Sequence, residues 1–251
     1  MKIRFLGTGT STGNPEIGCQ CEVCRSTDKR DRRMRASVSV ETSGCNILID
    51  CGPDFRWQML KSGISSLDAV LITHEHYDHV GGLDDLRPYC KTKAINIYAE
   101  TYVAEAIQTR LPYAFIEHKY PGVPLIELHP IENEPFIVNN TSIKPVRLMH
   151  GSLPVFGYRI GNMAYLTDIK TIPEEEYGKL RDLDILIIDA LRKEEHISHQ
   201  NLEQALKQIE RINPRKSYLI HMSHHFGLHA IMEKQMPDNV FISYDGLEVV
   251  V

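Results

Sequence analysis

The sequence predicts a layered α/β sandwich. Strand-like segments occur in both halves of the chain, helical segments lie between them, and histidine or aspartate residues follow several apolar strands. Elements in this alternation pack as layers, with polar sites at the strand ends. No internal repeat, low-complexity tract or linker-like stretch interrupts the chain, so residues 1–251 are expected to form one domain.

The first half of the chain is expected to be rich in strands. Gly7 to Gly13 is a Gly/Thr/Ser loop that fits neither the dinucleotide fingerprint nor a phosphate-binding loop. A turn at Ser43-Gly44 joins two of the expected strands. The expected strands are residues 2–6, 36–41, 46–50, 70–73 and 95–99, and a helix is expected near 101–110.

The second half carries turn signals and one clear helical period. Hairpin turns are expected at Asn139-Asn140, Gly161-Asn162 and Asp245-Gly246. Ser198 is expected to cap a helix. Its apolar residues recur at helical spacing, at Leu202, Ala205, Leu206, Ile209 and Ile212. Further strands are expected at residues 184–188 and 218–220.

Composition and charge restrict the class of protein. Of the 251 residues, 42% are hydrophobic and 24% charged, as in ordinary globular proteins, and the net charge of −5 argues against a nucleic-acid partner. The sequence shows neither a secretory signal nor a membrane-spanning run, so a cytoplasmic protein is expected. Because disulfides are rare there, the six cysteines are expected to be thiols or metal ligands. Cys45, Cys51 and Cys90 are expected to be small buried apolar residues.

The strongest chemical signal is the segment Thr73-His74-Glu75-His76-Tyr77-Asp78-His79. In an extended loop His74 and His76 point the same way, so both can reach one ion. Asp78 and His79 lie beyond a turn and can reach a second ion. The alternative is a polar loop with coincidental histidines, but the density of ligand types favours metal binding.

Three further candidate ligands share one setting. His150, Asp168 and His221 each follow an apolar strand. A single polar residue at a strand end is more often a capping or hydrogen-bonding residue. The recurrence of this setting, together with the histidine-rich segment, favours metal ligation.

Three cysteines, Cys19, Cys21 and Cys24, lie within six residues. They can close on one zinc ion with a fourth ligand from elsewhere. A redox pair or three packed thiols is the alternative. Residues 25–35 carry six basic and two acidic side chains, which either form a solvated surface or grip phosphate.

In order and approximate spacing, the histidine-rich segment and the three strand-end residues resemble the metallo-β-lactamase superfamily over nearly the whole chain. The resemblance implies a four-layer αβ/βα sandwich. Asp50 resembles the strand-end aspartate that supports the metal site in this family. An aspartate bridge with histidine at every nitrogen position is similar to the hydrolase branches, not to the antibiotic-degrading enzymes that use a cysteine. The implied ligands are His74, His76 and His150 for one metal, Asp78, His79 and His221 for the other, and Asp168 as the bridge.

The cysteine segment resembles the subfamily that contains a cyclic phosphodiesterase of bacterial phosphonate breakdown. That resemblance implies that His224 is the fourth ligand of a structural zinc. It also implies that His199 faces the metals and protonates a leaving oxygen or holds a phosphate oxygen. His196, His225 and His229 are expected to be surface or supporting residues.

The expected function is a metal-dependent hydrolase acting on a small cyclic, ribosyl-type phosphodiester. Two zinc or manganese ions, with iron as a third option, would provide a bridging hydroxide as nucleophile. Asp78 is thereby a catalytic residue as well as a ligand, beside His199. The expected partner is a small anionic substrate, with no membrane partner, and a homodimer is compatible with the sequence. The alternatives are a thioesterase, a lactonase, an RNA-processing hydrolase, or a non-catalytic metal-binding protein.

Overall fold

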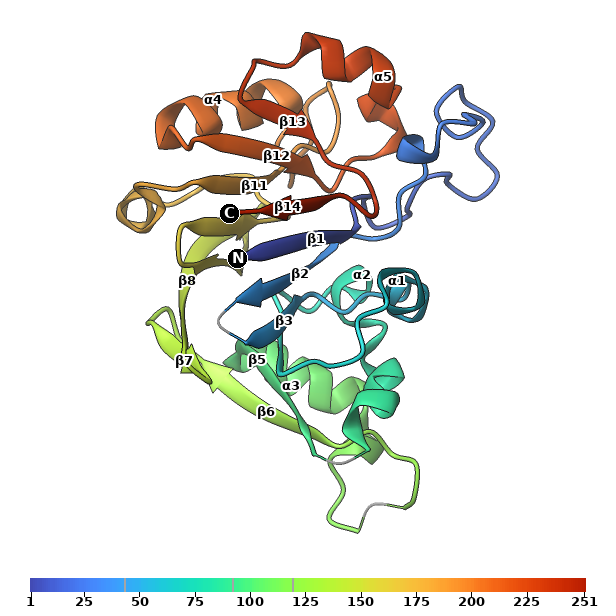
Figure 1. Cartoon of the computed structure of the whole chain (residues 1–251), viewed down its shortest axis with the longest axis vertical. Helices are drawn as coiled ribbons and strands as arrows, with labels where there is room; N and C mark the ends of the chain where they lie inside the picture. The colour runs from blue at the N-terminus through green and yellow to red at the C-terminus, as the bar shows by residue number, and fades with distance from the viewer. Residues whose placement is uncertain (43, 92, 119) are drawn as a thin grey trace.

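A computed structural model describes residues 1–42, 44–91, 93–118 and 120–251. Two seven-stranded sheets pack face to face, and helices cover the outer face of each sheet (Figure 1). The two chain ends lie side by side, because the first and last strands pair.

The first sheet has the strand order β14-β1-β2-β3-β4-β5-β6. The pairs from β14 to β3 are antiparallel, and the pairs from β3 to β6 are parallel. The strands are β1 (Lys2–Gly7), β2 (Ser37–Thr42), β3 (Cys45–Ile49), β4 (Ala69–Leu71), β5 (Ile95–Glu100), β6 (Ile126–Ile131) and β14 (Glu248–Val250).

The second sheet has the order β13-β12-β11-β10-β9-β8-β7. Here the pairs from β7 to β10 are antiparallel, and those from β10 to β13 are parallel. The strands are β7 (Phe136–Val138), β8 (Thr141–His150), β9 (Leu153–Ile160), β10 (Met163–Leu166), β11 (Ile185–Asp189), β12 (Lys216–Ile220) and β13 (Val240–Ile242).

Five α-helices and six short 3₁₀ segments connect the strands within the described ranges. No helix in the described part of the chain is long and apolar enough to cross a membrane. The helices are α1 (Phe55–Ser62), α2 (Tyr77–Val80), α3 (Thr101–Arg110), α4 (Leu202–Ile212) and α5 (His229–Met232). The 3₁₀ segments are Lys29–Asp31, Leu83–Cys90, Pro112–Ala114, Glu174–Leu180, His224–Phe226 and Glu233–Gln235.

Three buried clusters confirm the four-layer αβ/βα sandwich. The central cluster joins inward-facing side chains of both sheets, such as Ile47 and Tyr165. A second cluster packs the other face of the first sheet, including Leu48, against α1 and α3. The third packs the outer face of the second sheet against α4. Ile47 and Leu48 enter different clusters because successive side chains of a strand point to opposite faces.

The parallel strands of both sheets end at the same edge, where their backbone is unusual. Asp50 after β3, Asp168 after β10 and His221 after β12 have φ angles of 63°, 53° and 61°. Residues other than glycine rarely adopt this left-handed conformation, and such strain is found mostly at functional sites. The edge is therefore the place to look for the site.

The expected turns are only partly correct. Asn139-Asn140 and Gly161-Asn162 join antiparallel neighbours, as predicted. Asp245-Gly246 makes no hairpin, because β13 and β14 belong to different sheets and the chain crosses between them there. Ser43, half of the fourth expected turn, lies outside the described residues.

The expected cap of the long C-terminal helix is wrong. The helix begins at Leu202, and its cap is Asn201, which accepts a hydrogen bond from the Gln204 amide. The Gln204 side chain bonds back to the Asn201 amide. This reciprocal capping box outcompetes Ser198, three residues earlier.

Candidate metal centre

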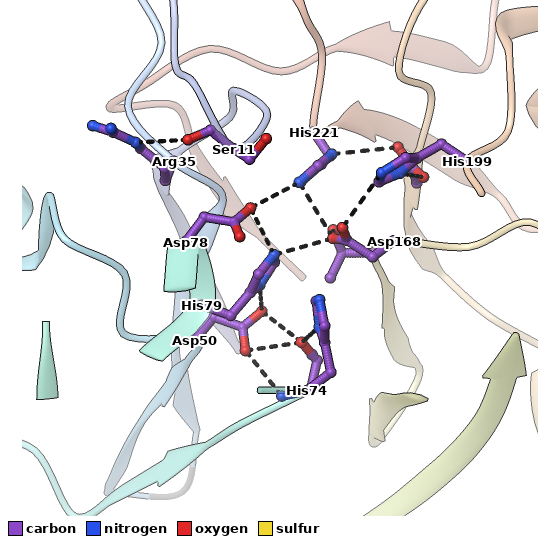
Figure 2. Close-up of polar contacts among 12 residues, drawn as sticks. Ser11, Arg35, Asp50, His74, Asp78, His79, Asp168, His199 and His221 are labelled. Carbon is purple, nitrogen blue, oxygen red and sulfur yellow. Dashed lines mark hydrogen bonds and ion pairs between the residues drawn. The ribbon is translucent and has the colours of Figure 1, made fainter. Parts of the chain in front are cut away.

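The structure brings the seven expected ligands together in two neighbouring groups at the shared strand edge. Within each group, one donor atom per residue lies within 4.8 Å of all the others. The groups are His74, His76 and His150, and Asp78, His79, Asp168 and His221. The rings of His74 and His79, one from each group, are only 4.3 Å apart. Figure 2 shows Asp78, His79, Asp168 and His221 converging on one another from different parts of the chain.

A close backbone approach positions the ligands on α2, the short helical turn that follows His76. A Cβ on Gly52 would lie 2.0 Å from the Asp78 carbonyl oxygen, and a Cβ on Gly82 would lie 2.1 Å from the Gly52 carbonyl oxygen. Only glycine permits these contacts without moving the backbone. The amide of Cys51 donates to the His79 carbonyl at 2.8 Å. The helical turn is thereby held against the end of β3.

Hydrogen bonds fix the orientation of the candidate ligand rings. His79 Nδ1 lies 2.8 Å from Asp50 Oδ2, and His74 Nδ1 lies 3.0 Å from Thr73 Oγ1, which itself donates to Asp50. A bond at Nδ1 leaves Nε2 as the free donor for a metal. Asp50 therefore supports two rings, His79 directly and His74 through Thr73, consistent with its expected supporting role.

The third fixed ring belongs to the second sheet. His150 Nδ1 donates to the Ser198 carbonyl oxygen at 2.9 Å. The Ser198 backbone thus serves the site in a way that the sequence did not reveal.

The inward-facing nitrogens lie among carboxylates. His79 Nε2 is 3.2 Å from both Asp78 Oδ2 and Asp168 Oδ2. His221 Nε2 is 3.3 Å from Asp168 Oδ2 and 3.5 Å from Asp78 Oδ2. Yet the Nε2 atoms of His74, His79 and His221 are buried and make no hydrogen bond with the described residues. Buried polar atoms of this kind need a partner, and a cation at their centre would provide it.

The electrostatics show why this cluster favours cations. Burial would raise the pKa of Asp168, but His221 and His79 hold it well below its usual value. Burial would lower the pKa of His79, but Asp78 and Asp168 raise it well above its usual value. The pKa of His221 rises to about 9 for the same reason. His74 behaves differently, because burial and His79 keep its pKa well below its usual value. The ionised carboxylates thus require positive charge.

His199 lies beside these ligands and is held by a residue that the sequence analysis missed. Its Nδ1 lies 3.0 Å from Asp189 Oδ2. Its Nε2 lies 3.8 Å from Asp168 Oδ1 (Figure 2). Asp189 is fully buried at the end of β11, and its other oxygen lies 3.9 Å from His221 Nδ1. Asp189 therefore orients His199 toward the candidate metal ligands and faces His221 as well. The rule that singled out Asp168, an acid at the end of an apolar strand, also fits Asp189.

The predicted cysteine site is assembled from distant segments. Sulfur atoms of Cys19, Cys21 and Cys24 and a nitrogen of His224 lie within 4.8 Å of one another. Cys24 Sγ is 3.2 Å from His224 Nδ1. Burial, the main cause, raises the pKa of Cys24 to about 12, whereas the backbone amide of Cys24 lowers the pKa of Cys21. The geometry fits a tetrahedral zinc, which would join the N-terminal loop to the loop that follows β12. The other cysteines, Cys45, Cys51 and Cys90, are buried as predicted.

Two arginines of the basic run, Arg33 and Arg35, have structural contacts, whereas Arg25, Lys29 and Arg32 are exposed. Arg33 is buried and donates to Thr8 Oγ1 and the Ser243 carbonyl oxygen at 2.9 and 2.6 Å. Arg35 pairs with Asp54 at 3.0 Å and donates to the Ser11 carbonyl oxygen (Figure 2). These two guanidinium groups are therefore engaged by the protein itself.

The three histidines that were expected at surface or supporting positions differ in their surroundings. His225 is exposed and His196 is half-buried. His229 is fully buried, with Nδ1 3.2 Å from Arg33 Nη2, so a surface position is wrong for it. It faces the buried arginine and supports the N-terminal loop.

A four-layer αβ/βα sandwich with this donor set at its strand ends defines a class of metal-dependent hydrolases. Residues 45–222 match the family model described as the Beta-lactamase superfamily domain. The chain therefore belongs to the β-lactamase superfamily, and its fold is the metallo-β-lactamase fold.

Three known proteins are similar to the chain. It is 37% identical to a crystal structure of a new diphosphatase from the PhnP family, with a TM-score of 0.93 over 99% of this chain and 96% of that one. It is 50% identical to an octanoyltransferase of Porphyromonas gingivalis over 100% of this chain, but spans only 52% of that relative's length. Zinc-bound PqqB of Methylobacterium extorquens shares the fold at 18% identity, with a TM-score of 0.81 over 100% of both chains. The fold implies divalent metal ions.

Proposed function

We propose that the protein hydrolyses a P–O bond of a small anionic phosphoester, with a phosphodiester as the first candidate substrate. The observation that carries the proposal is the pair of adjoining donor groups, in which the buried Nε2 atoms of His74, His79 and His221 make no hydrogen bond with the described residues. The 37% identity to a diphosphatase over 99% of the chain supports phosphorus chemistry.

The donor set fits two divalent cations. His74, His76 and His150 would hold one, and Asp78, His79 and His221 the other, with Asp168 between them. Imidazole and carboxylate donors suit zinc, manganese or iron. When bound, such ions activate water as a nucleophile and offset the negative charge that develops during attack. Both donor groups contain residues from the two halves of the chain, which supports one catalytic unit spanning residues 1–251.

The protein's own side chains would orient the ligand rings and supply a proton. Asp50, Thr73 and the Ser198 carbonyl fix three rings with Nε2 inward. Asp189 accepts a hydrogen bond from His199 Nδ1–H, so the doubly protonated ring would present Nε2–H to the substrate. His199 would donate this proton to the departing oxygen, which converts a poor alkoxide leaving group into an alcohol. Cys19, Cys21, Cys24 and His224 would hold a structural zinc apart from the reaction.

A second candidate is hydrolysis of an acyl compound such as a thioester. It is favoured by the 50% identity to the octanoyltransferase, although this chain spans only 52% of that protein. Acyl transfer there can belong to the part that this chain does not match.

A substrate panel separates the candidates. Metal-loaded protein is assayed with bis-p-nitrophenyl phosphate, a cyclic nucleotide, a ribosyl cyclic phosphate, a diphosphate, an octanoyl thioester and a lactone. The proposal predicts kcat/KM at least 100-fold higher for a phosphorus substrate than for either acyl compound. Asp168→Asn, measured in parallel, controls for contaminating activity. Preference for the thioester or the lactone would overturn the proposal.

A further inference from the structure

The loop between β11 and α4 carries a second histidine close to His199. The ring centroids of His196 and His199 are 5.1 Å apart. The His199 ring is in turn 4.5 Å from the His150 ring and 5.0 Å from the His221 ring. His196 therefore lies next to the ring that adjoins both donor groups, although it belongs to neither group.

Lys170 holds this loop in place. Its Nζ donates to the carbonyl oxygens of His196 and His199 at 2.7 and 3.3 Å, and to Gln204 Oε1 at 3.2 Å. Lys170 lies two residues after Asp168, and Gln204 belongs to the capping box of α4. One ammonium group thus links the metal-ligand strand, both histidines and the helix. The backbone that carries both rings is therefore held in place before any substrate arrives, which reduces the cost of binding.

The hydrogen bonding of His196 makes it a donor. The Ser198 amide donates to His196 Nδ1 at 3.4 Å, so the proton of the neutral ring lies on Nε2. Burial, with His199 and Arg192, lowers the pKa of His196 and favours this neutral ring. Nε2 has no hydrogen-bond partner in the part of the chain that the structure describes, and it is not among the buried polar atoms. It is free to donate to an anionic oxygen.

The loop around His196 carries two basic residues, which favour an anion, and two acidic residues, which do not. Arg192 belongs to the same loop and uses Nη2 to bond the Glu195 carbonyl oxygen at 2.7 Å, while its Nε is buried without a partner among the described residues. Lys193 is exposed beside it, and the carboxylates of Glu194 and Glu195 are exposed to solvent. Arg192 Nε therefore lies inside the loop, and the acids face water.

We propose that His196 binds a second phosphoryl group of the substrate, one bridging oxygen away from the phosphorus under attack. Two phosphoryl groups joined by one oxygen would each meet one of the two histidines that the loop holds side by side. The substrate class is then a compound with a diphosphate, in place of an isolated phosphodiester. This inference rests on the proposed phosphoester hydrolysis and names its substrate class.

The test is isothermal titration calorimetry of metal-loaded protein with inorganic pyrophosphate and inorganic phosphate at a fixed free-metal concentration. A hydrogen bond to a charged group implies a loss of about 10- to 100-fold in pyrophosphate affinity for His196→Ala. Phosphate affinity should change less than about twofold. His196→Gln keeps an N–H donor at the position of Nε2 and should restore most of the loss. His118→Ala, in the exposed loop between α3 and β6, is the matched control.

Two results would overturn the inference: unchanged pyrophosphate affinity in His196→Ala, or an equal loss for both anions. Thermal melting of each variant confirms that it is folded. Because binding needs no turnover, this result is independent of the proposed reaction. A His196-dependent preference for pyrophosphate in a protein that cleaves no phosphoester would overturn the reaction and keep the site. Phosphoester hydrolysis without that preference would keep the reaction and overturn the His196 site.

Discussion

Replacement of His199 by alanine should cost activity in proportion to how poorly the leaving group departs. The ring is nearly buried, is held by Asp189 at 3.0 Å, and places Nε2 3.8 Å from Asp168 Oδ1 at the edge of the donor ring. A proton donor in this position typically contributes about 10²–10⁴-fold in rate, or roughly 3–5 kcal/mol. The full loss is expected for an alkyl or sugar phosphodiester.

A p-nitrophenolate group leaves without a proton, so His199→Ala should cost much less on bis-p-nitrophenyl phosphate. If His199 instead only donates a fixed hydrogen bond to a phosphate oxygen, both substrates should lose about 10- to 100-fold alike. The assay is therefore the ratio of kcat/KM losses on the two substrates at saturating metal. Proton donation predicts a ratio of about 100 or more.

Asp189 offers an internal control, because its Oδ2 holds the His199 ring. Asp189→Asn should show the same dependence on the leaving group, and combining it with His199→Ala should add little further loss. Metal content should stay near wild type in His199→Ala, since His199 is not an assigned ligand. Equal losses on both substrates would refute proton donation, and no loss on either would make His199 a bystander.

Three other outcomes are expected. Asp168→Asn should lose at least one metal per chain by elemental analysis and about 10²-fold or more of the activity, because a neutral amide bridges two cations poorly; full metal content would contradict the assigned bridge. Cys21→Ser should lower the melting temperature by roughly 6–12 °C, equivalent to about 3 kcal/mol, with little change in kcat of the folded protein; unchanged zinc content would mean that the thiols hold no metal. Burial raises the pKa of Asp245 to about 6, so the folded protein binds this proton more tightly than the unfolded chain does. Stability should therefore fall by up to about 3 kcal/mol as the pH rises from about 4 to 6, and Asp245→Asn should remove that slope in urea unfolding; an identical slope in both proteins would refute this account.

The sequence predicted which candidate ligands the fold brings together, because each belongs to a local pattern. His74 and His79 lie in a dense polar segment after an apolar strand, and His150 and His221 end strands of their own. Such patterns depend on neighbours in the sequence. The fold then brings them together, as the alternation of strands and helices suggested.

The supporting contacts were harder to predict because they join distant segments. The Ser198 carbonyl binds His150 from 48 residues away, and a backbone atom leaves no signal in the sequence. The burial of Arg33 depends on Thr8 and Ser243, which approach it only in the folded chain. In both cases tertiary contacts, and not local composition, decide the role.

Turn and cap signals failed where a longer-range choice competed with them. Asp245-Gly246 has the composition of a hairpin turn, but the strands on either side pair in different sheets. Ser198 has a good capping side chain, but Asn201 can form a reciprocal box with Gln204. Local sequence preference permits several turns or caps. The pairing of strands and side chains in the folded protein decides which one forms.

The candidate ligands are divided between the two halves of the chain, and each donor group takes residues from both. A cation bound to either group is thus a removable crosslink between the two sheets. If the chain were cut between β6 and β7, at residues 132–135, each fragment would keep an incomplete ligand set. The two fragments should then reassemble more tightly with divalent metal than with a chelator. The ions proposed for catalysis would thereby also strengthen the association of the two halves of the molecule.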